Sequence, residues 1–347
     1  MENDTKKRFC LVEKFRLLER SSQIGIVLIL LGVFVFSFLV FSGEKNEITS
    51  ITPTLDEKEK LQVIASFYPL AFLAERIGGE KVSVSDLAGS RDVHTYQVTP
   101  SDMVRLLDAD VVLFQGKGFE PWVEDSIDQL KTSNVRTLAL LEKLELPTYE
   151  EESHEEENHK EESHEENGHE EEHTHGGIDP HTWVDPLLAK EMALLIRDIF
   201  IQIDDQNKSV YEKNAQVLFD QLDQLDREYR QKLTVCTREE VIVSHNAFGY
   251  LAKRYDFTTH AIAGISTLDE PSAKLLTQLK EEASSGVTHI LTEEGSVTRY
   301  AETLSLETGL QMLPINPMGR GTLDPSKNYF DVSRENLQSL ALSLGCE

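Results

Sequence analysis

A tract of glutamate and histidine between Glu150 and His175 is the stretch of the chain best suited to metal chemistry. It contains thirteen Glu, six His and one Lys, and no Val, Ile, Leu, Phe or Met. Such a segment cannot bury enough apolar surface to offset the entropy of ordering, so we expect a disordered loop over residues 150–176. Imidazole suits zinc and its transition-metal neighbours, whereas the alternative is a polar linker with incidental histidines. The predicted weak, auxiliary ligands are the six histidines of the tract: His154, His159, His164, His169, His173 and His175.

Three further histidines occupy equivalent places beside predicted strands and helices. His94 follows a strand in DVHTYQVTP, His181 lies between two Asp-Pro pairs before an apolar helix, and His245 ends the strand VIVSH. Asn316, at the end of the strand QMLPIN, is a fourth position of this kind. Ligands gather at the carboxyl ends of strands in α/β sheets, so these side chains are expected to converge on a metal. Two other histidines, in or near strands, are expected to be structural: His260 and His289.

The segment HEEEH over residues 169–173 matches the H-E-x-x-H signature of zinc peptidases. That chemistry needs both histidines on one face of a packed helix, with the glutamate activating water. The neighbours in the tract are polar residues or glycine, so nothing would pack such a helix, and in so biased a composition the match is expected by chance. We therefore expect no enzyme, with a zinc-dependent hydrolase as the alternative from another class.

The length and charge of the chain are compatible with a two-lobed body that binds a cation. The 347 residues suffice for two lobes with cores of their own. The net charge is −27, and the tract from Glu150 to His175 supplies −12 of it, from thirteen Glu against one Lys. The remainder is moderately acidic, which argues against a nucleic-acid partner and permits a cation as ligand.

An uncharged apolar run of eighteen residues, from Ile24 to Phe41, precedes this body. It is just long enough to span a bilayer, and six Lys and Arg before it predict a cytoplasmic N-terminus. Residues 1–43 are therefore interpreted as a cytoplasmic end with an uncleaved anchor over 24–41, which we favour, or with a signal cleaved near Ser42. Either way the rest of the chain is expected to be extracytoplasmic, and no cysteine stands directly after the run for lipid attachment.

The cysteines are only weak evidence for a disulfide. Cys10 lies before the apolar run, whereas Cys236 and Cys346 follow it and would share the extracytoplasmic side. The sequence leaves open whether these two form a disulfide or remain free, buried thiols.

The order of predicted elements indicates two α/β lobes joined by helices. Residues 44–60 are polar and form a tether. Strands and helices alternate over residues 61–186, two helices follow over 187–236, and the alternation resumes over 237–347. This alternation predicts mostly parallel sheets built from βαβ units. The second connecting helix, with about 25 residues and a length of about 37 Å, suits a rigid strut between lobes.

From about Leu61 onward the chain resembles the metal-binding periplasmic proteins of ATP-driven zinc and manganese importers. The resemblance rests on segments spread over nearly the whole extracytoplasmic part: VHTYQVTPSD, GKGFEPWV, DPHTWVDP, SHNAFGYLAKRY and TEEG…AETLSLETG…INPMG. It implies two α/β lobes bridged by one long helix, with the metal held in the cleft between them and delivered to the membrane permease of an ABC importer. Zinc-type members carry His at the third ligand position and an acidic His-rich loop, where manganese-type members usually have Glu at that position. This chain has both zinc-type features.

Carried over position by position, the resemblance implies that His94, His181 and His245 are ligands, together with Asn316. The fourth position is commonly Asp, and Val98 replaces a proline usual in the first motif. The site is therefore expected to hold the metal with three histidines plus water, or with three histidines plus a long Asn contact. We expect Zn²⁺ as the ion, a manganese or broader divalent-metal carrier as the alternative, no nucleic acid, and a monomer.

Overall fold

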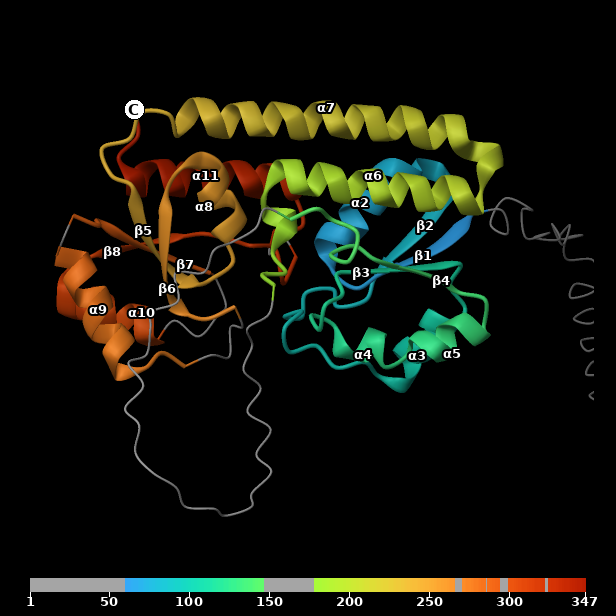
Figure 1. Cartoon of the computed structure of the whole chain (residues 1–347), viewed down its shortest axis with the longest axis horizontal. Coiled ribbons are helices and arrows are strands. Elements are labelled where there is room, and N and C mark those ends of the chain that lie inside the picture. Colours follow the sequence, from blue (N-terminus) through green and yellow to red (C-terminus); the bar gives the residue numbers. More distant parts are fainter. Residues whose placement is uncertain (1–59, 147–177, 266–269, 285, 294–298, 322–323) are drawn as a thin grey trace, which may run out of the picture. The chain divides into compact units, whose positions relative to one another are not determined.

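The computed structural model of the chain describes residues 60–146, 178–265, 270–284, 286–293, 299–321 and 324–347. The predicted anchor, nearly all of the tether, Cys10 and the six histidines of the tract lie outside these residues. Residues 59–347 form one unit, which contains both predicted lobes (Figure 1). Within the described part of the chain, no helix is long and apolar enough to cross a membrane.

The first lobe is built on a four-stranded parallel sheet in the order β2-β1-β3-β4 (Figure 1). Its strands are β1 (Leu61–Ala65), β2 (Val82–Asp86), β3 (Val111–Phe114) and β4 (Arg136–Ala139). Its helices are α2 (Tyr68–Gly78), α3 (Pro100–Leu107), α4 (Pro121–Glu124) and α5 (Ile127–Thr132). The central strand β3 is buried along its whole length, as expected for a parallel strand covered on both faces.

The second lobe repeats this topology with the strand order β6-β5-β7-β8, again all parallel. Its strands are β5 (Glu240–His245), β6 (Thr258–Ala263), β7 (His289–Thr292) and β8 (Gln311–Pro314). Its helices are α8 (Gly249–Tyr255), α9 (Ala273–Ser284), α10 (Arg299–Thr308) and α11 (Tyr329–Leu344). In both sheets the strand order reverses between the first and third strands of the lobe. Such a reversal opens a crevice at the carboxyl ends of those strands, where ligands bind in folds of this kind.

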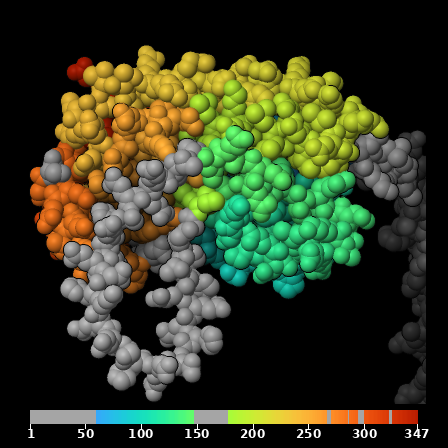
Figure 2. Space-filling view, viewed as in Figure 1, coloured from blue at the N-terminus to red at the C-terminus, as the bar shows by residue number. Residues whose placement is uncertain are grey.

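Two helices, α6 (Pro186–Ile203) and α7 (Lys208–Lys232), join the lobes along one edge (Figures 1 and 2). Asp185 caps α6 by accepting hydrogen bonds from two backbone N–H groups of its first turn. The start of α7 is fixed to the first lobe by Asn214, whose Nδ2 donates to the Ile77 carbonyl at 3.0 Å. Near its other end, the Tyr229 hydroxyl donates to the Ser333 carbonyl of the second lobe at 2.6 Å. The predicted fold class, two parallel α/β lobes bridged by a long helix, is confirmed.

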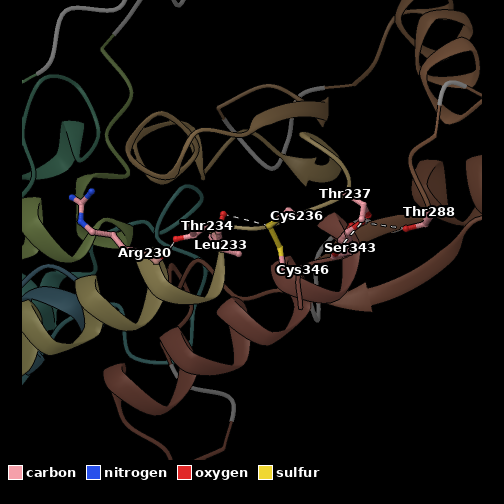
Figure 3. The surroundings of a disulfide bond; sticks show 9 residues. Arg230, Leu233, Thr234, Cys236, Thr237, Thr288, Ser343 and Cys346 are labelled. Atoms are coloured by element: carbon pink, nitrogen blue, oxygen red, sulfur yellow. Dashed lines mark hydrogen bonds between the residues drawn. A yellow bond between two sulfur atoms is a disulfide. The ribbon is translucent and has the colours of Figure 1, made fainter.

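Cys236 and Cys346 form a disulfide, which resolves the alternative that the sequence leaves open (Figure 3). Cys236 follows α7 and Cys346 follows α11, so the bond joins the end of the bridging helix to the last helix of the chain. The hydrogen bond from the Arg238 N–H to the Leu344 carbonyl, at 3.0 Å, lies beside it. With a sequence separation of 110, the closed loop contains the whole sheet of the second lobe.

Candidate metal centre

His94, His181 and His245 come together between the two lobes. One ring nitrogen of each lies within 4.8 Å of those of the other two. Nε2 of His181 is 3.3 Å from Nε2 of His94, and the ring centroids of the three residues are 5.3, 5.4 and 5.8 Å apart. Two nitrogens bound at about 2.05 Å to one tetrahedral zinc ion lie about 3.3 Å apart, so this spacing fits a shared zinc. Among the described residues, no other group of His, Cys, Asp and Glu side chains is arranged in this way.

Each histidine comes from a different part of the fold. His94 lies in the loop between β2 and α3, and His245 is the last residue of β5. His181 directly precedes the short 3-10 helix η3 (Thr182–Val184) at the start of the connection between lobes. The cluster therefore forms only when both lobes and the connecting segment are in place.

The loop that carries His94 is fixed to the second lobe. The Asp92 carboxylate accepts the His94 N–H at 3.0 Å through Oδ1 and pairs with Arg320 of the second lobe at 2.8 Å through Oδ2. The neighbouring Val93 N–H donates to the Gly319 carbonyl at 3.2 Å. These contacts hold the first-lobe histidine beside the other two.

The segment that carries His181 is likewise bonded across the lobes. The buried Trp183 donates its Nε1–H to the Pro317 carbonyl at 2.6 Å, and its own carbonyl accepts the Tyr329 hydroxyl at 2.7 Å. Asp185, two residues further, pairs with Arg254 of α8. A segment bound this firmly presents His181 in one position.

Two of the three imidazoles have a carboxylate beside Nδ1. His181 Nδ1 is 2.7 Å from Asp179 Oδ1, and His245 Nδ1 is 3.2 Å from Glu293 Oε2. A carboxylate in this position favours the proton on Nδ1, which leaves the lone pair of Nε2 free for a metal. Nε2 of His245 is buried and has no hydrogen-bond partner among the described residues, as expected for an atom that binds a metal ion.

Burial keeps two of the three imidazoles neutral. It lowers the pKa of His94 to about 2, and repulsion from His181, His245 and Arg320 acts in the same direction. Burial also lowers the pKa of His181, although Asp179 opposes the shift. Because only neutral imidazole coordinates a metal, these two nitrogens are available over the physiological pH range.

An aromatic wall closes one side of the cluster. The Phe119 ring packs edge-on against His94, with centroids 5.1 Å apart, and its centroid is 6.2 Å from that of His181. The centroid of the Trp183 ring is 5.1 Å from that of His181 and 5.6 Å from that of Phe119. Apolar side chains here exclude water, which strengthens electrostatic interactions inside the site.

Asn316 is engaged within its own loop. Its Oδ1 accepts the Met318 N–H at 2.6 Å, and its Nδ2 donates to the Gly321 carbonyl at 3.4 Å. The buried Asn336 of α11 fixes its backbone, accepting the Asn316 N–H at 2.8 Å and donating to its carbonyl at 2.7 Å. The amide oxygen therefore already uses one of its two lone pairs within the loop.

The other described histidines lie outside the cluster. His260 stands between Glu240, at 3.5 Å, and Glu282, at 3.1 Å, on the second sheet. His289 contacts the Thr288 hydroxyl at 2.8 Å.

Sequence reasoning did not identify Glu293, the carboxylate beside His245, although it directly follows β7, the strand that pairs with β5.

Residues 63–342 match the family model of the zinc-uptake complex component A, periplasmic. The chain belongs to this family. It is 32% identical over 321 residues to the high-affinity zinc uptake system protein ZnuA of Bacillus subtilis, covering 90% of this chain and 97% of that protein. It is 31% identical over 287 residues to the zinc-binding lipoprotein AdcA of Streptococcus pneumoniae, covering 81% of this chain and 55% of AdcA. The chain therefore spans about half the length of the AdcA relatives that it matches.

Solved structures share the fold. A Zn(II)-bound variant of AdcAII from Streptococcus pneumoniae superposes with a TM-score of 0.71 at 29% identity, over 83% of this chain and 99% of that one. The metal-dependent lipoprotein YcdH of Bacillus subtilis superposes with a TM-score of 0.66 at 29% identity, over 82% and 99%.

Proposed function

We propose that this protein is the extracytoplasmic zinc-binding component of an ATP-driven metal importer. It captures Zn²⁺ between its lobes with His94, His181 and His245 and delivers the ion to a membrane permease. The observation that carries the proposal is the convergence of three imidazoles from separate elements, with nitrogens within 4.8 Å of one another. The family and the zinc-binding relatives support it.

The chemistry of the donor set favours zinc over manganese. Three imidazole nitrogens suit zinc, whereas manganese prefers carboxylate, carbonyl and water oxygens. Asp179 and Glu293 act from behind His181 and His245, where they orient the rings and make the nitrogens more basic. The protein makes and breaks no covalent bond in this role, so it is a carrier and not an enzyme.

The same proposal assigns roles to the parts beyond the cluster. Residues 24–41 anchor the chain or are removed as a signal, and residues 44–60 tether the lobes outside the cytoplasm. The tract over residues 150–176 collects zinc weakly near the cleft, where it raises the local concentration. The protein acts as a monomer in this scheme.

We propose that water completes the coordination, because hydrogen bonds to Met318 and Gly321 direct both polar atoms of the Asn316 side chain into its own loop. An aspartate at this position could accept the same Met318 N–H. Asn316→Asp is therefore expected to tighten zinc binding by no more than about threefold, equivalent to about 0.7 kcal/mol, from its added charge alone. Competition with a zinc chelator measures the affinity, and tightening of tenfold or more would show that residue 316 coordinates the ion.

Deletion of residues 151–176 is expected to leave one tight zinc equivalent and to remove several weak ones. The tract has no apolar side chains, so no core depends on it, and the cost of closing a loop varies slowly with its length. Calorimetric zinc titration of the intact and deleted proteins measures both classes of site. Loss of the tight equivalent on deletion would make the tract part of the primary site.

The same titration at pH 7.5 and 5.5 separates the tight zinc site from the weak sites of the tract by the protonation of their histidines. An imidazole with the ordinary pKa near ~6.5 loses its metal over this range, and we expect this of the weak zinc binding by the tract. Three ordinary imidazoles would lose up to about thousandfold in affinity per pH unit below that pKa. Because burial lowers the pKa of both His94 and His181, we expect the tight site to lose at most about tenfold per unit. A loss as steep as that of three ordinary imidazoles would contradict the lowered pKa of His94 and His181.

A further inference from the structure

A buried carboxylate occupies the crevice of the first lobe, where the strand order reverses between β1 and β3. Glu120 is fully buried and receives hydrogen bonds on both oxygens. Oε1 accepts the Ser66 hydroxyl at 2.6 Å and the Gln115 N–H at 3.0 Å. Oε2 accepts the Gly116 N–H at 3.0 Å and shares the Gln115 N–H at 3.0 Å. Ser66 follows β1 and Gln115 follows β3, so the carboxylate joins the ends of the two strands.

The loop between Gln115 and Glu120 has an unusual backbone that depends on such an acceptor. Gly116, Lys117 and Gly118 have successive φ values of 84°, 57° and 82°, all in the left-handed region. Lys117 is a residue type that rarely adopts this conformation. Backbone N–H groups of a turn that point toward one place form an anion-binding nest, and buried N–H groups require an acceptor. The Glu120 carboxylate meets that requirement from within the chain.

Both ends of this loop reach the zinc ligands. At its start, the Gln115 side-chain Nε2 donates to the Pro180 carbonyl at 2.6 Å and to the Thr182 hydroxyl at 2.7 Å. These two residues flank His181. At the other end of the loop, Phe119 packs edge-on against His94. The loop therefore supports two of the three histidines, whereas the hydrogen bonds of Glu120 come from Ser66 and from the loop itself.

We propose that Glu120 is a positioning residue for the metal site, which holds the 115–119 loop in its left-handed form and thereby places His181 and His94. This inference rests on the proposed zinc-binding function. The ionised carboxylate is the form that suits the three donors, which are the Ser66 hydroxyl and the N–H groups of Gln115 and Gly116. A neutral acid or an amide would point a donor of its own at one of them. Burial raises the pKa of Glu120 to about 7, so the hydrogen bonds that the loop donates are what keep the ionised form accessible at neutral pH.

Glu120→Gln is the most direct test, because it keeps the size of the side chain and replaces the charged carboxylate by a neutral amide. We expect zinc affinity to fall about tenfold, the lower end of the effect of residues that orient metal ligands. The matched control is Leu130→Ala, which removes a fully buried side chain from α5 of the same lobe. If Leu130→Ala lowers the Tm of the metal-free protein about as much as Glu120→Gln does, its zinc affinity should still stay within about twofold of that of the unmodified protein.

A second readout reports geometry directly. The visible absorption of bound Co²⁺ depends on the arrangement of its ligands, so Glu120→Gln should change this spectrum whereas Leu130→Ala should not. Gln115→Leu, which removes the bonds to Pro180 and Thr182, should repeat both effects, and it provides the test if Glu120→Gln does not fold. Equal losses of affinity in Glu120→Gln and the control, with unchanged Co²⁺ spectra, would overturn the inference. Failure of the unmodified protein to bind zinc tightly would instead overturn the proposed function.

Discussion

Alanine at any one of His94, His181 and His245 should lower the zinc affinity of the tight site by about 100- to 1000-fold. Tight protein zinc sites bind with about 10–16 kcal/mol, so each of four ligands contributes about 2.5–4 kcal/mol. Removal of one nitrogen leaves two from the protein, which hold zinc poorly. Competition with a chromophoric chelator of known affinity measures the change in each variant.

Two other histidines provide matched controls for this series. His260→Ala and His289→Ala make the same substitution outside the cluster, and neither should change the affinity of the tight site. If one of the three clustered histidines can be replaced without loss of affinity, that residue is not a ligand.

Loss of the disulfide should have the largest effect on stability. Cys236→Ser opens a loop with a sequence separation of 110, which contains the whole second sheet. A disulfide typically contributes about 2–4 kcal/mol, mainly by restricting the unfolded chain, with the larger values for long loops. At about 2–4 °C per kcal/mol, the Tm of the metal-free protein should fall by about 5–15 °C. Thermal unfolding followed by circular dichroism measures this change.

The third cysteine supplies the control for this substitution. Cys10→Ser in the full-length chain should leave the Tm unchanged, because Cys236 and Cys346 bond to each other. A reductant should lower the Tm of the unmodified protein to that of Cys236→Ser and should not lower the variant further. Equal Tm values for the unmodified protein and Cys236→Ser would show that the bond does not stabilise the fold.

Much of the fold and the convergence of three histidines follows from patterns that are local in the sequence. Strand and helix signals alternate clearly, and parallel sheets bring the residues at their carboxyl ends to one edge. His245 ends β5 and His94 follows β2 in this way. Because the signal lies in short segments, the sequence alone was enough to predict these two positions.

The residues behind the ligands could not be predicted because they depend on pairing between distant segments. The sequence TEEG offers two adjacent glutamates, and only the register of β7 beside β5, with Val243 opposite Leu291, brings Glu293 level with His245. The Asn316 side chain is bound by the N–H of Met318, whose φ of 65° gives no signal in the sequence. The groups that donate hydrogen bonds to Glu120 likewise come from the ends of two separate strands, β1 and β3.

The metal content of residues 59–347 with residues 151–176 deleted, after chelation and reloading with equal Zn²⁺ and Mn²⁺, tests the central claim most directly. These residues belong to one compact unit, and the deletion removes the six histidines of the tract. We expect one zinc and no manganese per chain, and no metal when alanine replaces His94, His181 and His245 together. Manganese in place of zinc, or one zinc retained by the triple variant, would contradict a zinc site built from these histidines.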